Sequence, residues 1–453
     1  MALKLFGRVL ILFLVSAGAS GQFNIPDVTI QALKPKGIRV SIPDDSSLSL
    51  FVFQGNVNRG IKNTDVGQIS GEITAPKRGK WVFEDLNIDL KPNDVINYYV
   101  YVVSNRKGYF KDNLSFTVKE LVDPSAPASS PECRSTLTQV RDGKACAGQV
   151  IFEDNFDRLN EDLWYIEQYV PEQPDYPFLL NFFKTFRGFS NNSIYSGTLD
   201  LISGCTTRST YSSKCSTSAW GANILPPVVS GRLTSKLSFK YGLVEVRAKL
   251  PRGDWIFPDI LLEPLLNKYG FMNYASGIIR IAGARGNSEL MFGNDNIGNQ
   301  VLYGGPIMDF NCRQYLIRTK YSGNPWSNDF HLYAVLWEPT RITLTVDGIE
   351  WARVEPTTNG LQGQLPRDCP LPRDLLNTGT SMAPFDDYFY TTLGVSAGGI
   401  SEFPDGIYTS GSRLKPWRNR GRKAMLNFWQ DMDAWWPTWS QPLVIDYVRI
   451  KAL

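Results

Sequence analysis

The stretch from residue 239 to residue 287 constrains the fold more than any other part of the chain. Residues 243–250 alternate between apolar and mainly polar side chains, which is the period-two pattern of a β-strand. A Pro-Arg-Gly-Asp break follows, then an apolar segment over 255–262 and a loop closed by Gly270. A second strand is expected over 277–282, with Ile278 and Arg280 on the same face.

This second strand resembles the core strand of glycoside hydrolase family 16, the laminarinase-like β-1,3-glucanases. There the pattern G-E-x-D-x-x-E-x-R-G-N carries the nucleophile, an assisting Asp and the general acid, and Gly277 and residues 285–287 match its two ends. The three carboxylate positions are held by Ile278, Arg280 and Gly283. A retaining glycosidase needs two carboxyl groups about 5–5.5 Å apart. We therefore expect a glucanase fold with no catalytic residue and no glucanase reaction.

The N-terminus is typical of a secreted protein. Residues 1–21 combine a basic start at Lys4 and Arg8, an apolar run over 9–15 and small residues over 17–21, which predicts a signal peptide. The apolar run is much shorter than the ~20 residues that a membrane-spanning helix requires. The mature chain is expected to be soluble and extracellular.

Six cysteines in a secreted chain predict three disulfides, and the sequence alone leaves about fifteen pairings open. Loop lengths favour the pairs Cys133–Cys146 and Cys205–Cys215, which leaves Cys312–Cys369. Asn113 and Asn191 open sequons and are candidate glycosylation sites. A single histidine and the absence of Cys-x-x-Cys spacing predict no metal site, and no cofactor is expected. A net charge of +3 without a basic block argues against nucleic acid as a partner.

Residues 22–120 predict a small all-β domain. Ile38, Val40 and Ile42 alternate with polar residues before a Pro-Asp-Asp-Ser turn, and residues 94–103 form a long alternating strand. No helical periodicity of useful length interrupts these strands, which favours an immunoglobulin-like β-sandwich.

The same segment resembles the N-terminal glucan-binding module of the insect β-1,3-glucan recognition proteins, also called Gram-negative-bacteria-binding proteins. The resemblance is carried by four stretches, in the family's order: 36–44, 50–55, 79–83 and 94–99. Glucan contacts in this family come from an Asp, a Trp and an Arg, and the corresponding positions here are Glu72, Tyr99 and Phe110. Tyr99 offers a smaller stacking face than Trp, and Phe110 lacks the charged donors of Arg. The alternative is that both aromatic residues serve only the strand.

Residues 121–132 contain three prolines among Ala and Ser and are expected to form a linker. From residue 133 to residue 453 the family 16 resemblance implies a β-jelly roll of the concanavalin-like type. Its motifs are found over residues 152–157, 326–331, 336–339, 389–399 and 445–450.

The former cleft offers its own candidate residues. Trp255 precedes the lost catalytic strand, and Trp439 falls where family 16 enzymes carry aromatic residues at the cleft rim, so both are candidates for stacking on sugars. The alternative assigns them to the core. Arg280 is expected to pair with an acid such as Asp254 or Glu263, or else to bind an anionic ligand.

Together these patterns favour a secreted, non-enzymatic pattern-recognition protein of innate immunity. The resemblance implies binding of microbial β-1,3-glucan, or of peptidoglycan or lipopolysaccharide, and signalling to an extracellular serine-protease cascade. Two alternatives stay open. The chain could be a secreted scaffold that has lost sugar binding, or an active β-1,3-glucanase with relocated carboxylates. Fold resemblance alone does not decide among them, because function resides in the site.

Overall fold

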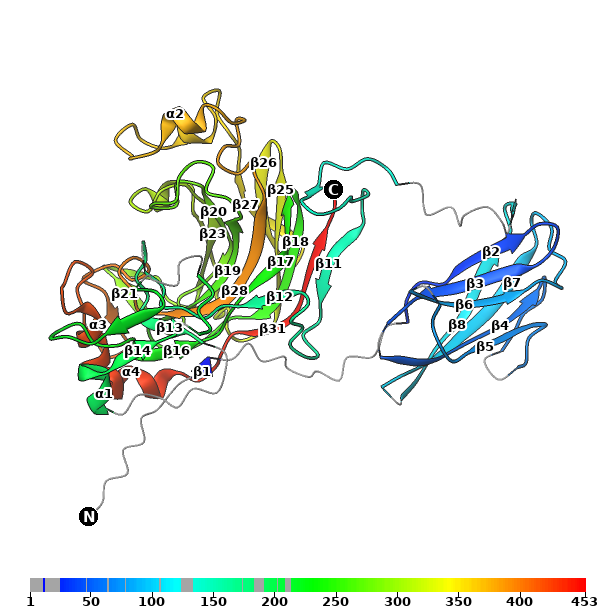
Figure 1. Cartoon of the computed structure of the whole chain (residues 1–453), viewed down its shortest axis with the longest axis horizontal. Helices are drawn as coiled ribbons and strands as arrows, with labels where there is room; N and C mark the ends of the chain where they lie inside the picture. The colour runs from blue at the N-terminus through cyan, green and yellow to red at the C-terminus, as the bar shows by residue number, and fades with distance from the viewer. Residues whose placement is uncertain are drawn as a thin grey trace, which may run out of the picture. The chain divides into compact units, whose positions relative to one another are not determined.

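The computed structural model describes residues 11–12, 25–45, 47–62, 65–77, 79–105, 107–123, 133–172, 174–182, 191–201, 203–207 and 213–453. The chain separates into two compact units, one within residues 18–132 and the other taking in residues 133–453 (Figure 1). Both are built from β-strands. Apart from residues 11–12, the expected signal peptide lies outside the described residues.

The first unit is an immunoglobulin-like β-sandwich of two four-stranded sheets. One sheet has the order β6 (Lys80–Asp85), β3 (Ile38–Pro43), β2 (Thr29–Leu33), β9 (Leu121–Val122). The other has the order β5 (Ile69–Ile73), β4 (Leu48–Val57), β7 (Val95–Ser104), β8 (Lys107–Thr117). Alternate side chains from both sheets fill the core, which includes Phe51, Phe53, Trp81 and Val100. The side chain of Trp81 is buried, and its indole N–H donates to Asp44 Oδ1 at 2.8 Å.

Two residues of the expected linker belong to the sandwich. Residues 121–122 form β9, because their backbone pairs in parallel with Ala32 and Leu33 of β2. Residues 124–132 lie outside the described residues.

The second unit is a β-jelly roll with two large sheets. The six-stranded sheet has the order β11 (Val150–Asp154), β31 (Val444–Lys451), β18 (Gly242–Lys249), β25 (His331–Glu338), β26 (Arg341–Val346), β27 (Ile349–Val354). The eight-stranded sheet has the order β10 (Gln139–Val140), β17 (Arg232–Lys240), β28 (Phe389–Ala397), β19 (Ile256–Pro264), β20 (Ile278–Gly283), β23 (Val301–Ile307), β24 (Arg318–Tyr321), with β12 (Trp164–Ile166) also pairing with β17. The strands expected around 243–250 and 277–282 are thus β18 and β20, one in each sheet.

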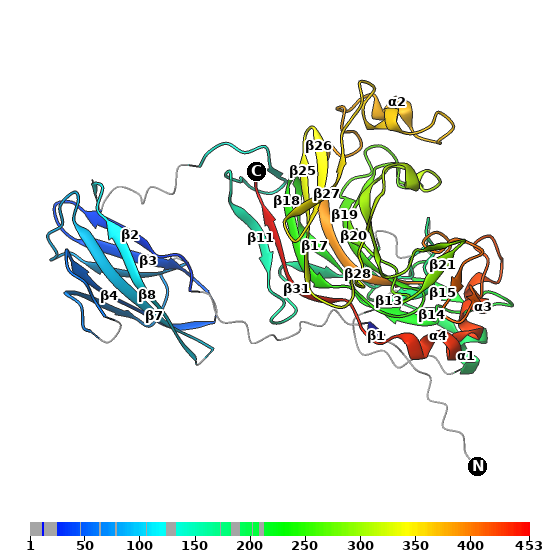
Figure 2. The ribbon, with the colours of Figure 1, turned by 180° about the vertical axis from the view of Figure 1, so that it is seen from behind.

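Small elements gather mainly on one side of these sheets (Figure 2). The short strands are β1 (Ile11–Leu12), β13 (Leu179–Asn181), β14 (Thr198–Asp200), β15 (Ser216–Ser218), β16 (Val228–Ser230), β21 (Leu290–Phe292), β22 (Asp295–Asn296), β29 (Tyr408–Thr409) and β30 (Arg413–Leu414). The helices are α1 (Asn191–Ser196), α2 (Arg373–Leu376), α3 (Ala424–Gln430) and α4 (Met432–Trp435), with 3-10 turns η1 (Arg313–Tyr315), η2 (Leu361–Gln364) and η3 (Trp436–Thr438).

Three disulfides reinforce the second unit, two in the pairs that loop length favoured and the third between the two remaining cysteines. They join Cys133 to Cys146, Cys205 to Cys215 and Cys312 to Cys369. Of the two candidate glycosylation sites, Asn113 is exposed on β8. Asn191 begins α1, and its side chain lies outside the described residues.

Candidate functional site

The outer face of the β5-β4-β7-β8 sheet brings two of the expected sugar-binding residues into one row. Glu72 on β5 lies opposite Val52 on β4, Val52 lies opposite Tyr101 on β7, and Tyr101 lies opposite Phe110 on β8. Because side chains alternate along a strand, all four point away from the core that Val100 and its neighbours enter. Glu72 is exposed, and Phe110 is 57% exposed.

Tyr101, which the sequence analysis did not single out, completes an aromatic surface with Phe110. The two ring centroids lie 4.6 Å apart. Gly108 makes room for Tyr101, because a Cβ atom at Gly108 would lie 2.2 Å from the Tyr101 hydroxyl. The period-two pattern of 94–103 already placed Tyr101 on the face of Tyr99, so the signal was present in the sequence. We call Glu72, Tyr101 and Phe110 the sandwich face.

Tyr99 is not placed for the stacking role expected of it. Only 8% of the residue is exposed, although its ring centroid lies 6.2 Å from that of Phe110. Its hydroxyl donates to the Asp65 carbonyl at 2.9 Å, and Gln54 beside it accepts from the Gly67 N–H at 2.8 Å. These bonds hold the segment after β4 across Tyr99, so the ring supports this segment instead of facing solvent.

In the second unit, Trp255 is a core residue, contrary to the expectation that it stacks on sugar. It is 0% exposed and packs edge-to-face on Phe403 and Trp417, with ring centroids 5.3 and 5.1 Å away. Trp439 is half-buried, and its indole N–H donates to the Asp254 carbonyl at 2.7 Å. Its ring lies 4.8 Å from that of Trp435, so one side of Trp439 is used in packing.

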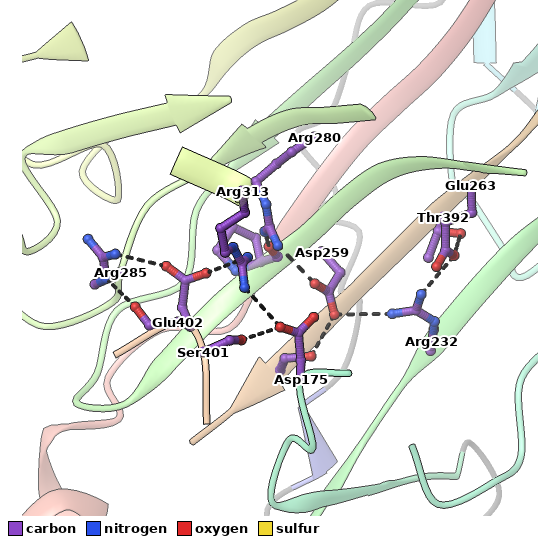
Figure 3. Close-up of polar contacts among 12 residues, drawn as sticks. Asp175, Arg232, Asp259, Glu263, Arg280, Arg285, Arg313, Thr392, Ser401 and Glu402 are labelled. Carbon is purple, nitrogen blue, oxygen red and sulfur yellow. Dashed lines mark hydrogen bonds and ion pairs between the residues drawn. The ribbon is translucent and has the colours of Figure 1, made fainter. Parts of the chain in front are cut away.

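The eight-stranded sheet presents a second candidate site on the face turned away from the six-stranded sheet, which we call the open face. Ile260 and Leu262 of β19 enter the core, so Asp259 and Glu263 point to the open face. Arg232 of β17 lies between these two acids, 3.1 Å from Asp259 and 2.7 Å from Glu263 (Figure 3).

Arg280 pairs with neither of the acids that the sequence analysis named. Asp254 pairs instead with Arg413 at 3.2 Å, and Glu263 with Arg232. Arg280 is 3% exposed, donates to the Pro258 carbonyl at 3.1 Å and lies 4.0 Å from Asp259. The sequence analysis did not single out Asp259, because the arginines that contact it belong to other strands.

The ion pairs of Arg232 and Arg280 are one half of a larger charged network on the open face, and the other half lies beside Arg280. Arg313 pairs with Asp175 at 2.9 Å and with Glu402 at 3.7 Å, and Arg285 pairs with Glu402 at 3.2 Å (Figure 3). Burial acts to raise the pKa of Asp175, but Arg313 and hydrogen bonds from Ser401 and Tyr274 outweigh it and lower this pKa. Asp175 is therefore ionised at neutral pH.

The open face is thus filled by charges that balance each other. Among the described residues, the ion pairs on this face join four guanidinium groups to four carboxylates, namely Arg232, Arg280, Arg285 and Arg313 with Asp175, Asp259, Glu263 and Glu402. Of these carboxylates, Asp175 is kept ionised by Arg313 and is therefore a poor proton donor.

Side chains of the core occupy the positions where the resemblance places the family 16 carboxylates. Ile278 is buried, and Gly283 pairs with Tyr303 across β20 and β23. A Cβ atom at Gly283 would lie 2.6 Å from Cε2 of Tyr303, so the tyrosine ring takes the space of a longer side chain.

Two further features concern metal sites and membrane-spanning helices. Among the described residues, no group of three or more His, Cys, Asp or Glu side chains is arranged to hold a metal ion. In the same part of the chain, no helix is long and apolar enough to cross a membrane.

Comparison with known proteins agrees with this two-unit architecture. The family model described as "Carbohydrate binding domain (family 32)" matches residues 24–139, and the model "Glycosyl hydrolases family 16" matches residues 312–372. A β-1,3-glucan-binding protein of Hyphantria cunea is 54% identical, over 98% of this chain and 98% of its own. The chain belongs to the β-1,3-glucan-binding protein family. The family resemblance seen in the sequence is thereby confirmed.

Other members and a solved structure extend the comparison. Gram-negative bacteria-binding protein 1 of Drosophila melanogaster is 33% identical over 98% of both chains. The laminarinase of Rhodothermus marinus, a solved structure, is 19% identical, covers 68% of this chain and 98% of its own, and has a TM-score of 0.39. The relatives in this family are named as binding proteins and not as enzymes.

Proposed function

We propose that this protein is a secreted recognition protein that binds microbial β-1,3-glucan through the sandwich face and does not hydrolyse it. The observation that carries the proposal is the row formed by Glu72, Tyr101 and Phe110, with the Phe110 ring largely in solvent. An exposed aromatic ring can stack on the apolar face of a pyranose, and a carboxylate can accept hydrogen bonds from sugar hydroxyls. The relatives named for β-1,3-glucan binding support the choice of ligand.

Sedimentation of the full chain with insoluble β-1,3-glucan tests this proposal. We expect Phe110→Ala to weaken binding at least tenfold, about 1.4 kcal/mol, because a few central aromatic residues carry most of the energy of such contacts. Phe292→Ala is the matched control, since Phe292 is a similarly exposed phenylalanine in the second unit. Equal binding by Phe110→Ala and the parent chain would refute the assignment to the sandwich face.

The absence of hydrolysis is a separate part of the proposal. The charge-balanced open face and the Tyr303 ring beside Gly283 support it. Incubation with laminarin should release no reducing ends above those of a heat-denatured sample. If reducing ends are released, and the release is lost when Asp259 or Glu263 is replaced, the protein is a glucanase with relocated carboxylates.

The family resemblance also implies that the bound protein passes a signal to extracellular serine proteases through protein contacts. Mixing the protein, glucan and purified protease precursors should give cleavage that requires all three. If the protein sediments with no microbial polymer, including peptidoglycan and lipopolysaccharide, the scaffold alternative takes the place of the recognition proposal. The covered ring of Tyr99 is the observation that favours that alternative.

A further inference from the structure

The stretch of chain that leads from β30 to α3 carries a concentration of positive charge (Figure 1). The net charge of the whole chain is only +3. The sequence analysis, which saw no basic block, overlooked this stretch. Residues 413–423 contain no Asp or Glu and six cations, namely Arg413, Lys415, Arg418, Arg420, Arg422 and Lys423.

The first two of these cations are neutralised within the fold. Arg413 pairs with Asp254 at 3.2 Å and with Asp431 at 3.6 Å. Lys415 is buried, and its Nζ lies 2.7 Å from Asp405. These two side chains therefore hold the stretch on the second unit and are not available to a ligand.

The other four cations are exposed and unpaired, and we call them the basic surface. They are Arg418, Arg420, Arg422 and Lys423. None of the four forms an ion pair with any residue that the structure describes. Their positive charge is therefore free to attract an anionic partner from outside the chain.

The backbone that carries the basic surface is fixed by the core. The Trp417 side chain is buried, and its indole N–H donates to the Gly399 carbonyl at 2.8 Å. Asn419 donates through Nδ2 to the Phe403 carbonyl at 2.9 Å and accepts from Lys415 Nζ at 2.7 Å. Because the loop is ordered before any ligand arrives, binding costs little backbone entropy.

The basic surface is suited to a polymer with several negative charges. A single exposed cation holds a small anion weakly, because water and salt screen the charge. A short run rich in Lys and Arg is typical of sites for heparin-like polysaccharides or nucleic acid. The three disulfides of the second unit fit an extracellular protein, which favours the polysaccharide.

Two other kinds of extracellular partner match the basic surface less well. Anionic phospholipids are concentrated in the cytoplasmic leaflet of membranes, which a secreted protein does not meet. Protein interfaces are usually centred on side chains that become fully buried, aromatic ones above all. Residues 418–423 contain no aromatic residue.

We propose that the basic surface binds a sulfated polysaccharide of the extracellular matrix, with sulfate groups paired to the four exposed cations. The proposal relies on secretion, which is part of the proposed function, and does not depend on glucan binding by the sandwich face. Such a contact holds the protein at tissue surfaces through the second unit and leaves the sandwich face available to microbial glucan.

Binding of the full chain to immobilised heparin tests the proposal, with desulfated heparin as the match. We expect heparin to bind more tightly than desulfated heparin, because the sulfate groups supply most of its negative charge. Arg420→Gln combined with Arg422→Gln should weaken heparin binding about tenfold. The remaining binding should depend less on salt, because fewer counterions are released. The same variant should sediment with insoluble β-1,3-glucan as the parent chain does.

Arg141→Gln combined with Lys144→Gln is the matched control, because it removes two exposed cations from another part of the second unit. It should leave heparin binding unchanged, as should Phe110→Ala. The proposal is overturned if heparin does not bind, if desulfated heparin binds equally, or if the control loses as much affinity as the test variant. It is also overturned if lipoteichoic acid, a phosphate polymer of bacterial walls, displaces heparin at a lower concentration of anionic groups than heparin itself requires.

Discussion

Asp254 should make the second unit less stable as the pH rises from about 4 to about 7. Burial raises the pKa of this carboxyl from 3.8 to about 6, against the opposing effects of Arg413 and a hydrogen bond from Asn287. Between these two values the folded state holds a proton that the unfolded state has lost. The resulting stability is complete below pH 3.8 and is lost as the pH rises through about 6.

The magnitude follows from the same interval. At ~1.36 kcal/mol per pH unit, a rise of the pKa from 3.8 to about 6 corresponds to about 3 kcal/mol. Asp254→Asn replaces the carboxyl with a neutral group that can still accept the bond from Asn287, whose Nδ2 lies 3.0 Å away. We therefore expect the variant to match the parent chain near pH 4 and to be more stable by up to about 3 kcal/mol near pH 7.

Urea unfolding followed by tryptophan fluorescence at a series of pH values measures this difference. One of the twelve tryptophans, Trp81, lies in the sandwich, so the signal reports mainly on the second unit. Asp374→Asn, at an exposed position in α2, is the control and should give no pH-dependent difference. A difference between Asp254→Asn and the parent chain that is the same at pH 4 and pH 7 would refute the reasoning.

Three further changes give shorter tests by denaturant unfolding. Asp386→Asn should lose about 2 kcal/mol at neutral pH, because the Asp386 carboxylate accepts from the Tyr269 hydroxyl at 2.6 Å. Backbone and side-chain hydrogen bonds outweigh burial and lower the pKa of Asp386, so this loss should shrink as the pH falls. Gly253→Ala should cost about 2 kcal/mol, because its Cβ would lie 2.5 Å from Cδ1 of Trp439. Gly283→Glu should cost about 1–3 kcal/mol and release no reducing ends from laminarin.

Strand patterns and loop lengths carried the predictions that the structure confirms. The alternation over 243–250 predicted β18, because a strand with one buried face repeats every two residues. The short, mainly apolar stretch over 277–282 predicted β20, which is buried along its whole length. The short loops between Cys133 and Cys146 and between Cys205 and Cys215 indicated their pairing, because nearby cysteines meet easily.

Side-chain direction at turns could not be predicted in the same way. Trp255 immediately precedes β19, but its backbone has φ of 66° and its ring enters the core. Tyr99 is one of the β7 residues that point away from the core. Its hydroxyl nevertheless bonds to the carbonyl of Asp65, 34 residues earlier in the chain, and the segment around Asp65 covers its ring. Neither outcome follows from the local pattern.

The charged network was hidden from the sequence because its partners are distant along the chain. Arg313 and Asp175 are separated by 138 residues, and Ser401 and Asp175 by 226. The one local signal was the spacing of Asp259 and Glu263, four positions apart on a strand, which places both on one face. An otherwise apolar segment that carries two acids on a single face indicates partners across the sheet.

The charge balance of this network bears on whether an added carboxylate on the open face could support hydrolysis. A glutamate at Ile278 would add a fifth carboxylate to a buried set in which four are matched by four guanidinium groups. An unmatched buried charge costs several kcal/mol, so the new acid would either take up a proton or draw Arg280 away from Asp259. In the first case it cannot act as a nucleophile, and in the second it is fixed by an arginine. Catalysis at this position would therefore require the removal of an arginine as well as the addition of an acid.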